Sequence, residues 1–315
     1  MKTILITGSS GFIGSHITEG LINSGYKIVA LKREASNLWR CNDYNNQIQW
    51  VNCDNLVSAE SEIINSNPEI LIHAAWNGVK EKDRDNWSEQ EKNLTFLVQL
   101  FEIVKKTSIS KIIALGSQAE YGKFEGRIDE KHTCNPNTAY GATKLSSSIL
   151  LKSFAQQNEI DWYWLRIFSV YGPKEENNWL IPATIKNLIE NKEMSLTPCE
   201  QLYDYIYIKD LVAGILSIVN IERNISGIYN FSSGQCSKIK IILSYLENTL
   251  APQKRLLHIG KLPYRLNQVM HMEGNSNLFF TRFNFGISYS ITEGLNETIK
   301  YYLNEKVNDT QISIF

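Results

Sequence analysis

Short apolar runs alternate with longer segments of helical period along the chain. The runs are rich in Ile, Leu and Val with little polar alternation, which is typical of strands buried on both faces, as in a parallel sheet. We therefore expect strands at Thr3–Thr7, Lys27–Leu31, Gln49–Asn52, Glu69–His73, Lys111–Gly116, Trp162–Ile167 and Gly227–Phe231.

Helical patterns fill the intervals between these strands. Ile13, Ile17 and Leu21 recur four positions apart, and residues 89–106 and 139–157 carry longer apolar faces. This alternation over the first 170 residues predicts an α/β fold with a doubly wound parallel sheet of about seven strands.

The pattern becomes less regular after residue 172, where loops lengthen and aromatic residues become frequent. The length of 315 residues allows two units of about 150 residues each. We predict a main domain at residues 1–172 plus about 206–232, which returns to the main sheet. A smaller C-terminal α/β lobe for the substrate takes residues 173–205 plus about 233–315.

Composition narrows the class of protein. Lys+Arg (32) and Asp+Glu (33) nearly cancel to a net charge of −1, which argues against a general nucleic-acid binder. The five cysteines are scattered without a CxxC pair, so neither a disulfide framework nor a metal site is expected. No stretch reaches the roughly 18 apolar residues of a membrane span. We expect a cytoplasmic protein with no membrane contact.

The first predicted strand runs into a turn with glycines at positions 8, 11 and 14, and a helical segment follows. Such glycines let a pyrophosphate approach the backbone, and the helix N-terminus offers it free N–H groups. The placement predicts a dinucleotide site, against the alternative of a glycine-rich turn without a ligand. Its residues are Gly8, Ser10, Gly11, Phe12, Ile13 and Gly14.

The end of the second predicted strand bears on which dinucleotide binds. An NAD site usually has an acid there for the ribose 2′-hydroxyl, whereas this chain has Lys32 and then Arg33. Two cations would pair with a 2′-phosphate, so we predict NADP(H). NAD(H) is the alternative if both side chains are merely solvated. Asp54 and Asn55 close the third strand, where an acid can receive the adenine amino group, although Asp54 could equally cap a turn.

A Tyr and a Lys four residues apart, Tyr140 and Lys144, share one face of a predicted helix. A neighbouring ammonium favours a phenolate, so Lys144 is expected to lower the pKa of Tyr140 and make it a proton donor to a carbonyl. Ser117 ends a predicted strand, where such sheets place their chemistry, and is the candidate to orient that carbonyl. Each pattern alone also occurs by chance.

Together these motifs resemble the extended short-chain dehydrogenase/reductase family, in its NAD-dependent epimerase/dehydratase branch for nucleotide sugars. The resemblance is carried by the three glycines, His73-Ala74-Ala75, Asn93, Ser117, Tyr121-Gly122, Tyr140 and Lys144, residues 165–173 and 204–210, and Thr292-Glu293-Gly294-Leu295.

The resemblance implies a Rossmann domain, a Ser117–Tyr140–Lys144 triad and a homodimer built from residues 89–106 and 139–157. It implies further cofactor contacts at Ala74, Ala75, Asn93, Tyr140, Lys144 and Val170. Asn93 could also be a buried amide that bonds to the backbone.

Departures from the family narrow the reaction. Its dehydratases carry an Asp-Glu pair directly after the Ser, where this chain has Gln118 and Ala119, so dehydration is not expected. Glu120 is expected to be structural. A 4-epimerase normally carries the NAD-type acid where Lys32 stands.

The remaining reaction is NADPH-dependent reduction of the C4 ketone of a nucleotide-linked 4-keto-6-deoxyhexose, in deoxysugar and surface polysaccharide biosynthesis. Residues 73–79 and 262–271 are similar to reductases of dTDP- or CDP-linked sugars, such as CDP-abequose synthase and dTDP-fucose-forming reductases. The alternatives are a nucleotide-sugar 4-epimerase with tightly bound NAD and a non-enzymatic dinucleotide-binding regulator.

Candidate substrate contacts follow the predicted strands or match family positions. Arg265 is the main candidate for the phosphates of the nucleotide sugar, with a surface salt bridge as its alternative. Trp179 could approach the nucleoside or only pack under a loop. The full set is Trp76, Arg84, Gln118, Ser169, Trp179, Leu180 and Arg265.

Overall fold

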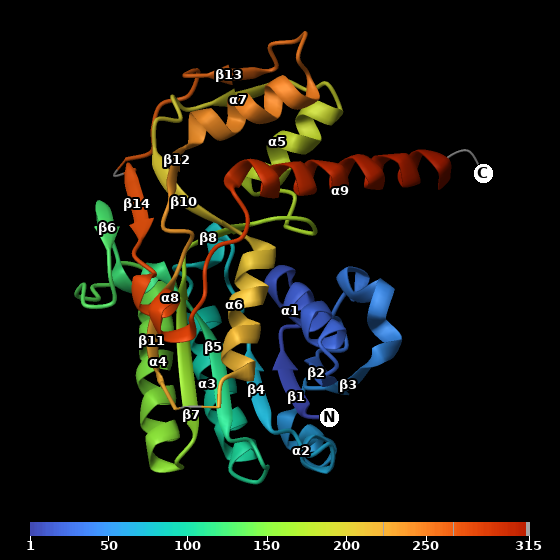
Figure 1. Ribbon diagram of the computed structural model, residues 1–315, viewed down its shortest axis with the longest axis vertical. Coiled ribbons are helices and arrows are strands. Elements are labelled where there is room, and N and C mark those ends of the chain that lie inside the picture. Colours follow the sequence, from blue (N-terminus) through green and yellow to red (C-terminus); the bar gives the residue numbers. More distant parts are fainter. Residues whose placement is uncertain (223, 267, 313–315) are drawn as a thin grey trace.

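A seven-stranded sheet, parallel throughout, forms the base of the molecule (Figure 1). The computed structural model describes residues 1–222, 224–266 and 268–312. The strand order is β3-β2-β1-β4-β5-β7-β11, which confirms the predicted doubly wound sheet. The strands are β1 (Thr3–Thr7), β2 (Lys27–Lys32), β3 (Ile48–Asn52), β4 (Ile70–His73), β5 (Lys111–Ser117), β7 (Asp161–Ile167) and β11 (Gly227–Phe231).

Helices cover both faces of this sheet, which explains the continuous apolar runs. Ile4 and Ile6 of β1 belong to a core shared with α1 (Phe12–Asn23) and α6 (Ile208–Asn220). Leu5, between them, belongs to the opposite core, shared with helices of the other layer. That layer consists of α2 (Leu56–Asn65), α3 (Trp87–Val104) and α4 (Ala139–Gln157).

A smaller lobe lies beyond the carboxyl ends of the main strands (Figure 1). Its larger sheet has the order β12-β10-β14-β6, with β8 paired to β10, and β9 pairs with β13. The strands are β6 (Gly126–Ile128), β8 (Ser169–Tyr171), β9 (Met194–Leu196), β10 (Leu202–Tyr207), β12 (Cys236–Lys238), β13 (Leu257–Ile259) and β14 (His271–Gly274). The remaining helices are α5 (Leu180–Ile189), α7 (Ile239–Leu250), α8 (Asn277–Phe283) and α9 (Ile291–Ile312), with short 3-10 helices η1 (Trp39–Gln47), η2 (Glu81–Asp83) and η3 (Gln118–Tyr121).

Two of these lobe strands, β6 and β8, come from within the predicted main domain, residues 1–172. Both have only three residues and pair with strands that come later in the chain. The predicted division of the chain into two domains stays a prediction.

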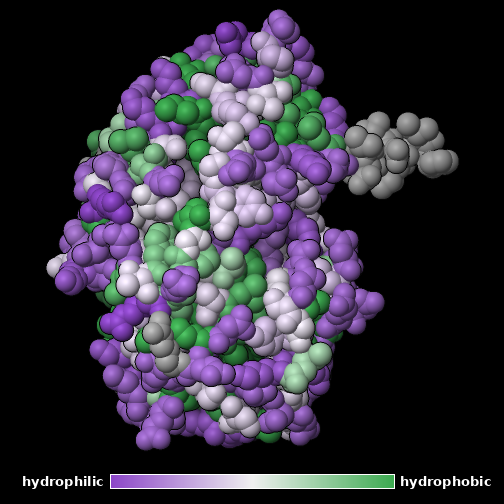
Figure 2. Space-filling model, viewed as in Figure 1, coloured by the Kyte–Doolittle hydropathy of each residue, from purple (hydrophilic) through white to green (hydrophobic). Residues whose placement is uncertain are grey.

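The visible face is mostly hydrophilic, with hydrophobic residues gathered over α6 and the segments beside it (Figure 2). Among residues 1–222, 224–266 and 268–312, no helix is both long and apolar enough to cross a bilayer.

Lys111, at the start of β5, ties α6 to the main sheet. Its buried ammonium donates hydrogen bonds to the carbonyl oxygens of Ile218 (2.8 Å), Val219 (3.2 Å) and Ile221 (2.6 Å), at the end of α6. Replacing Lys111 with Met leaves these buried carbonyls unpaired, so we expect the free energy of unfolding to fall by about 2 to 3 kcal/mol in urea titration.

The matched control is Lys105→Met, which removes an exposed ion pair with Glu102 and should change stability by less than about 1 kcal/mol. Equal effects of the two substitutions would contradict this role for Lys111.

Candidate active site

The glycine turn between β1 and α1 has a shape that side chains would not allow. Gly8 has a φ of 79°, and a Cβ there would lie 2.6 Å from the Ala75 backbone nitrogen. A Cβ on Gly14 would lie 2.0 Å from the Gly8 carbonyl oxygen. Gly11 is the N-cap of α1 and offers no side chain to bond the first N–H groups. These groups stay available for an anion, so the turn fits the pyrophosphate of a dinucleotide.

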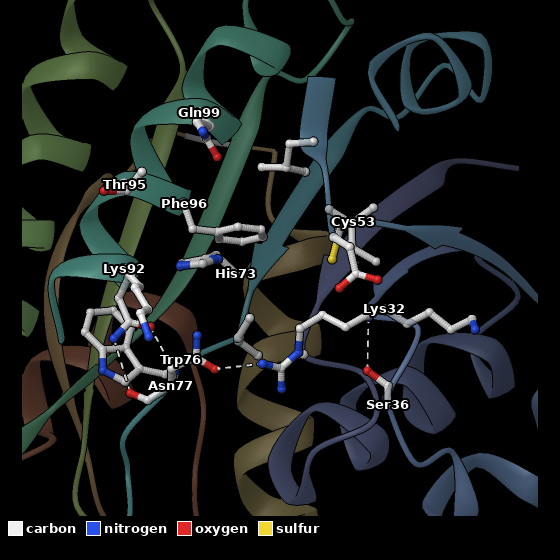
Figure 3. Close-up of a pocket in the computed structure, with 18 of the residues that line it drawn as sticks. Lys32, Ser36, Cys53, His73, Trp76, Asn77, Lys92, Thr95, Phe96 and Gln99 are labelled. Atoms are coloured by element: carbon white, nitrogen blue, oxygen red, sulfur yellow. Dashed lines mark hydrogen bonds between the residues drawn. The ribbon is translucent and has the colours of Figure 1, made fainter. Parts of the chain in front are cut away.

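A cleft of about 770 Å³ opens beside this turn, along the carboxyl ends of β1, β2, β3 and β4. In Figure 3, His73 lies against Phe96 on one side of it, and Lys32 and Ser36 lie on the other. Ten residues predicted to bind the cofactor line it: Gly8, Ser10, Gly11, Lys32, Arg33, Asp54, Asn55, Ala74, Ala75 and Asn93. The other predicted cofactor residues lie outside its lining: Phe12, Ile13, Gly14, Tyr140, Lys144 and Val170.

Two cationic side chains and one hydroxyl side chain lie at or just after the end of β2. Lys32 is the last residue of that strand and half-buried, whereas Arg33 is exposed. Arg33 donates from Nη1 to the Asn77 side-chain oxygen (3.4 Å), and its backbone N–H donates to the Ser36 hydroxyl (3.0 Å). Lys32, Arg33 and Ser36 all line the cleft and could hold a phosphate. Sequence analysis missed Ser36. The pattern that could have indicated it is a hydroxyl side chain three residues after Arg33.

Asp54 and Asn55, after β3, both take part in turns. The Asp54 carboxylate accepts a hydrogen bond from the Glu34 backbone N–H (2.8 Å). Asn55 caps α2 by accepting from the Val57 N–H (3.0 Å). One carboxylate oxygen of Asp54 is thus used to hold a turn, as the alternative for this residue proposed. Both Asp54 and Asn55 still line the cleft.

Asn93 holds the loop after β4 through backbone contacts. Its side-chain oxygen accepts from the Asn77 N–H (2.8 Å), and its amide donates to the Asn77 carbonyl (3.2 Å). Asn93 is therefore a buried amide that bonds to the backbone, which was the alternative to a cofactor contact. It also lines the cleft. Gln90, which sequence analysis missed, accepts from the Trp76 indole N–H (3.0 Å) and fixes that ring.

His73 ends β4 as a fully buried ring. Its Nδ1 lies 2.9 Å from the Thr7 hydroxyl, and its Nε2 has no hydrogen-bond partner among the described residues. Burial lowers the pKa of His73 to about 3, so the imidazole is neutral at physiological pH.

The turn after β5 is built on a buried ion pair. The Glu120 carboxylate accepts from Arg166 Nε (2.8 Å), from the Trp164 indole N–H (2.8 Å) and from the Ser117 backbone N–H (2.9 Å). Glu120 is 0% exposed, which confirms the expected structural role. The Ser117 hydroxyl in turn accepts from the Ala119 N–H, so Ser117 and Glu120 form a reciprocal capping box around η3.

The N-terminus of α4 brings Tyr140 to this turn. Gly141 allows the close approach, because a Cβ there would lie 2.4 Å from the Ala119 carbonyl oxygen. Tyr140 is 8% exposed, and the Ser117 side chain lies close enough to its phenol to lower the pKa of that group. The structure therefore brings together two of the three predicted catalytic residues as a pair of hydroxyls.

Burial and neighbouring groups together set the pKa of Tyr140. Burial raises the pKa of Tyr140, whereas the Ser117 side chain and the Arg84 cation lower it. Lys144 lies 5.9 Å from the Tyr140 ring centroid and donates to the Leu115 carbonyl (2.6 Å). The expected effect of Lys144 on the pKa of Tyr140 stays a prediction.

Lys144 itself lies in a dry, aromatic setting. Its ammonium sits 3.6 Å from the centroid of the Trp76 ring, in a cation–π contact. Burial lowers the pKa of Lys144 to about 7, while Glu120 raises it. Its charge is therefore only partial near neutral pH.

Several predicted substrate residues gather around Tyr140. Trp76 meets the Tyr140 ring edge-on, with centroids 6.1 Å apart. The Arg84 guanidinium carbon lies 5.1 Å from the Tyr140 ring centroid and 5.9 Å from that of Trp179. Trp179 is the N-cap of α5, which begins at Leu180.

Three other predicted substrate contacts have different settings. Gln118 is half-buried at the start of η3, and Ser169 is half-buried at the start of β8. Arg265 is exposed and forms an ion pair with Glu81. Such a surface salt bridge was the alternative to a phosphate contact. Phosphate binding by Arg265 stays a prediction.

One cluster in the described part of the chain carries three possible metal ligands. The ligand atoms of Cys236, His271 and Glu273 lie within 4.8 Å of one another. Glu273 already contacts His271 Nε2 (3.0 Å) and Arg127 Nε (3.4 Å). The prediction that no metal is used stays a prediction.

Comparisons with known proteins agree with this geometry. The model of the NAD dependent epimerase/dehydratase family matches residues 4–231. The chain is 26% identical to the CDP-abequose synthase of Salmonella muenchen over 302 residues, which cover 95% of this chain and 97% of that protein. It is 29% identical to the dTDP-6-deoxy-L-talose 4-dehydrogenase (NAD(+)) of Aggregatibacter actinomycetemcomitans over 242 residues, covering 75% and 86%.

The fold also matches a solved structure, the UDP-glucuronic acid 4-epimerase of Bacillus cereus in complex with NAD. The TM-score is 0.82 at 25% identity, over 95% of this chain and 96% of that one. The resemblance predicted from the motifs is confirmed at the level of the family.

Substitution of Glu120 tests the ion pair under the catalytic turn. Glu120→Gln leaves the buried Arg166 guanidinium without a counter-charge, so the free energy of unfolding should fall by about 3 to 5 kcal/mol. Urea titration measures this. The control, Glu102→Gln in the exposed pair with Lys105, should cost less than about 1 kcal/mol. A small loss at Glu120 would show that the turn is held by other contacts.

Proposed function

The chain belongs to the NAD dependent epimerase/dehydratase family of nucleotide-sugar enzymes, and within it we propose an NADPH-dependent 4-ketoreductase. The substrate is a nucleotide-linked 4-keto-6-deoxyhexose, with dTDP or CDP as the favoured nucleotide. The product enters deoxysugar or surface polysaccharide biosynthesis. Similarity to a CDP-abequose synthase and to a dTDP-6-deoxy-L-talose 4-dehydrogenase supports this substrate class.

One observation carries the choice of reaction. Glu120 is the carboxylate of the turn that holds Ser117, and it is fully buried and committed to Arg166 and Trp164. Its neighbours Gln118 and Ala119 have no acid–base group, so this turn offers no free acid or base for removing water from a sugar. The Ser117–Tyr140 pair can still give one proton to a carbonyl that accepts a hydride.

The reduced nicotinamide, when bound, supplies the hydride to C4 of the sugar. Tyr140 donates its phenolic proton to the ketone oxygen, so that the alkoxide is never left free. Ser117 orients the same oxygen by hydrogen bonding. Lys144, one helical turn after Tyr140, is assigned to lowering the pKa of Tyr140 and to binding the hydroxyl groups of the nicotinamide ribose. After release of the product, the Tyr140 phenolate takes up a proton from solvent.

The cofactor assignment depends on the end of β2. Lys32, Arg33 and the Ser36 hydroxyl line one cleft, and two cations with a hydroxyl suit a 2′-phosphate. NAD(H) is the alternative, because the B. cereus epimerase binds NAD and the Aggregatibacter relative is named for NAD(+).

A second candidate function is a nucleotide-sugar 4-epimerase. The similarity to the B. cereus epimerase favours it. Tyr140 and Ser117 would take up and return the proton, while a bound nicotinamide would first accept and then return the hydride. It requires that the cofactor remain bound through both half-reactions. Such epimerases normally carry an NAD-type acid where this chain has Lys32, which disfavours this candidate.

The proposal includes a homodimer in the cytoplasm. Apolar side chains stand exposed on the outer helices, with Val98 of α3 at 45%, and Ile149 and Leu150 of α4 at 61% and 37%. A second copy of the chain would cover them. All five cysteines are free, which fits a reducing compartment.

Substitution of the proton donor tests the reaction. With freshly made dTDP-, CDP-, GDP- and UDP-4-keto-6-deoxyhexoses, the wild type should consume NADPH with at least one. Tyr140→Phe should lower kcat about 100-fold or more, because general acid catalysis is lost, while NADPH binding followed by fluorescence is unchanged. Tyr245→Phe, in α7, is the matched control and should keep full activity.

Two outcomes would overturn this prediction. One is normal turnover by Tyr140→Phe. The other is a wild type that consumes no NADPH with any ketone, carries bound NAD and interconverts nucleotide hexoses, which would establish the epimerase.

Charge reversal at the end of β2 tests the choice of cofactor. Lys32→Asp places an anion beside the 2′-phosphate, so kcat/KM for NADPH should fall about 10- to 100-fold relative to NADH. Lys27→Asp reverses an exposed charge at the other end of the same strand and should leave the ratio unchanged. An unaltered ratio in Lys32→Asp would refute the NADP(H) assignment.

A further inference from the structure

Lys144 places an ammonium group in the interior, in the second turn of α4, where the residue is 5% exposed. A charge removed from water is costly unless neighbouring groups replace the water. The Leu115 carbonyl accepts one of the three N–H groups, at 2.6 Å from Nζ. Burial still lowers the pKa of Lys144 to about 7, so the other contacts of the ammonium decide how much of it is charged near neutral pH.

The Trp76 ring lies against this ammonium. The centroid of that ring is 3.6 Å from Lys144 Nζ, whereas the centroids of Tyr140 and Trp164 are 5.9 Å and 6.0 Å away. A cation over an indole face is attracted by the negative π cloud, and the attraction is stronger where water is excluded. Trp76 is also one of the residues that line the cleft (Figure 3). This ring therefore stabilises the charged form of Lys144 from the side of the cleft.

Gln90 of α3 holds the indole in this position. Its side-chain oxygen accepts from the Trp76 indole N–H (3.0 Å), and its amide donates to the carbonyls of Gly78 (2.9 Å) and Asp83 (3.3 Å). Gly78 has a φ of 70° and leaves room for the amide, since a Cβ there would lie 2.4 Å from Gln90 Nε2. Contacts with α3 and with the loop after β4 thus fix the ring over Lys144.

The titratable groups described around Lys144 do not supply a full counter-charge. Glu120 raises the pKa of Lys144, but its carboxylate is already paired in a buried ion pair. Burial lowers the pKa of His73 to about 3, so its imidazole is neutral. Burial also raises the pKa of Tyr140, so its phenol is neutral before the proton is transferred. The π face of Trp76 adds to a charge balance that these groups leave incomplete.

We propose that Trp76 is a positioning residue for the reaction, acting through Lys144: its π face holds the ammonium in place and keeps it charged one helical turn from Tyr140. When Tyr140 gives its proton to the ketone oxygen, the phenolate that remains then has a cation nearby. The effect of Trp76 on turnover rests on the proposed reductase function, whereas its effect on the charge of Lys144 does not.

Fluorination of the Trp76 ring tests this role without changing its shape. Tryptophan with one, two or three ring fluorines, placed at position 76 by amber suppression, has a progressively less negative π face. The Lys144 titration is followed in the full chain by NMR with isotopically labelled lysine, and its signal is identified by its loss in Lys144→Arg. We expect the pKa of Lys144 to fall stepwise, by about 0.5 to 1 pH unit with three fluorines.

Trp87 provides the matched control, because it is 66% exposed at the start of α3. The same series of fluorinated rings at Trp87 should leave the Lys144 titration unchanged. An unmoved titration across the series at position 76 overturns the proposal, since a ring that acts only by its bulk gives this result. An equal fall in the Trp87 series would show a general effect of fluorination and also overturns it.

Turnover separates this inference from the proposed function. Because less of Lys144 is then charged at high pH, three fluorines at position 76 should lower kcat at pH 8 relative to pH 6 by about 2- to 5-fold. A stepwise fall of the Lys144 titration with an unchanged kcat ratio would overturn the role of Trp76 in turnover. That fall in a protein that reduces no ketone would sink the reductase and keep the effect of Trp76 on Lys144. Normal reduction with a titration that ignores fluorination would do the reverse.

Discussion

The buried ion pair between Glu120 and Arg166 is the constraint on which the catalytic turn depends. A carboxylate with no exposed surface is costly unless it is fully paired, and here it accepts bonds from Arg166, from the Trp164 indole and from the Ser117 backbone. These bonds join β5 to β7 and fix Ser117 at the strand end. Gly116 leaves room for them, since a Cβ there would lie 2.2 Å from the Trp164 indole nitrogen.

The same ion pair also limits the chemistry of the site, because it makes the Glu120 carboxylate unavailable as an acid or base. With Glu120 committed to the interior, Ser117 and Tyr140 remain as the hydroxyl pair that the turn and the helix bring together. A site of this kind suits a single proton transfer coupled to a hydride. Two cations flank this pair: Arg84 lies beside the Tyr140 ring, and Lys144 is buried against the Trp76 ring.

Sequence patterns predicted the main sheet closely, because strands buried on both faces leave apolar runs that few other structures produce. All seven predicted strands are present, with ends that differ by one residue at most. The strands β6 and β8 gave no such signal, since each has three residues and pairs with distant segments. The glycine turn, Ser117 and Tyr140 were found by their spacing. The contact of Arg84 with the Tyr140 ring was not, because the two residues lie on separate segments and no spacing rule reports such contacts.

The proposed reaction requires a net transfer of hydride from a dissociable cofactor to C4 of the sugar. Reduction of the 4-keto sugar with NADPH deuterated at the transferable position tests this directly, with mass spectrometry and proton NMR of the product. We predict one deuterium at C4 for each NADP⁺ formed. Interconversion of two nucleotide hexoses with no label taken up from the added cofactor would contradict it.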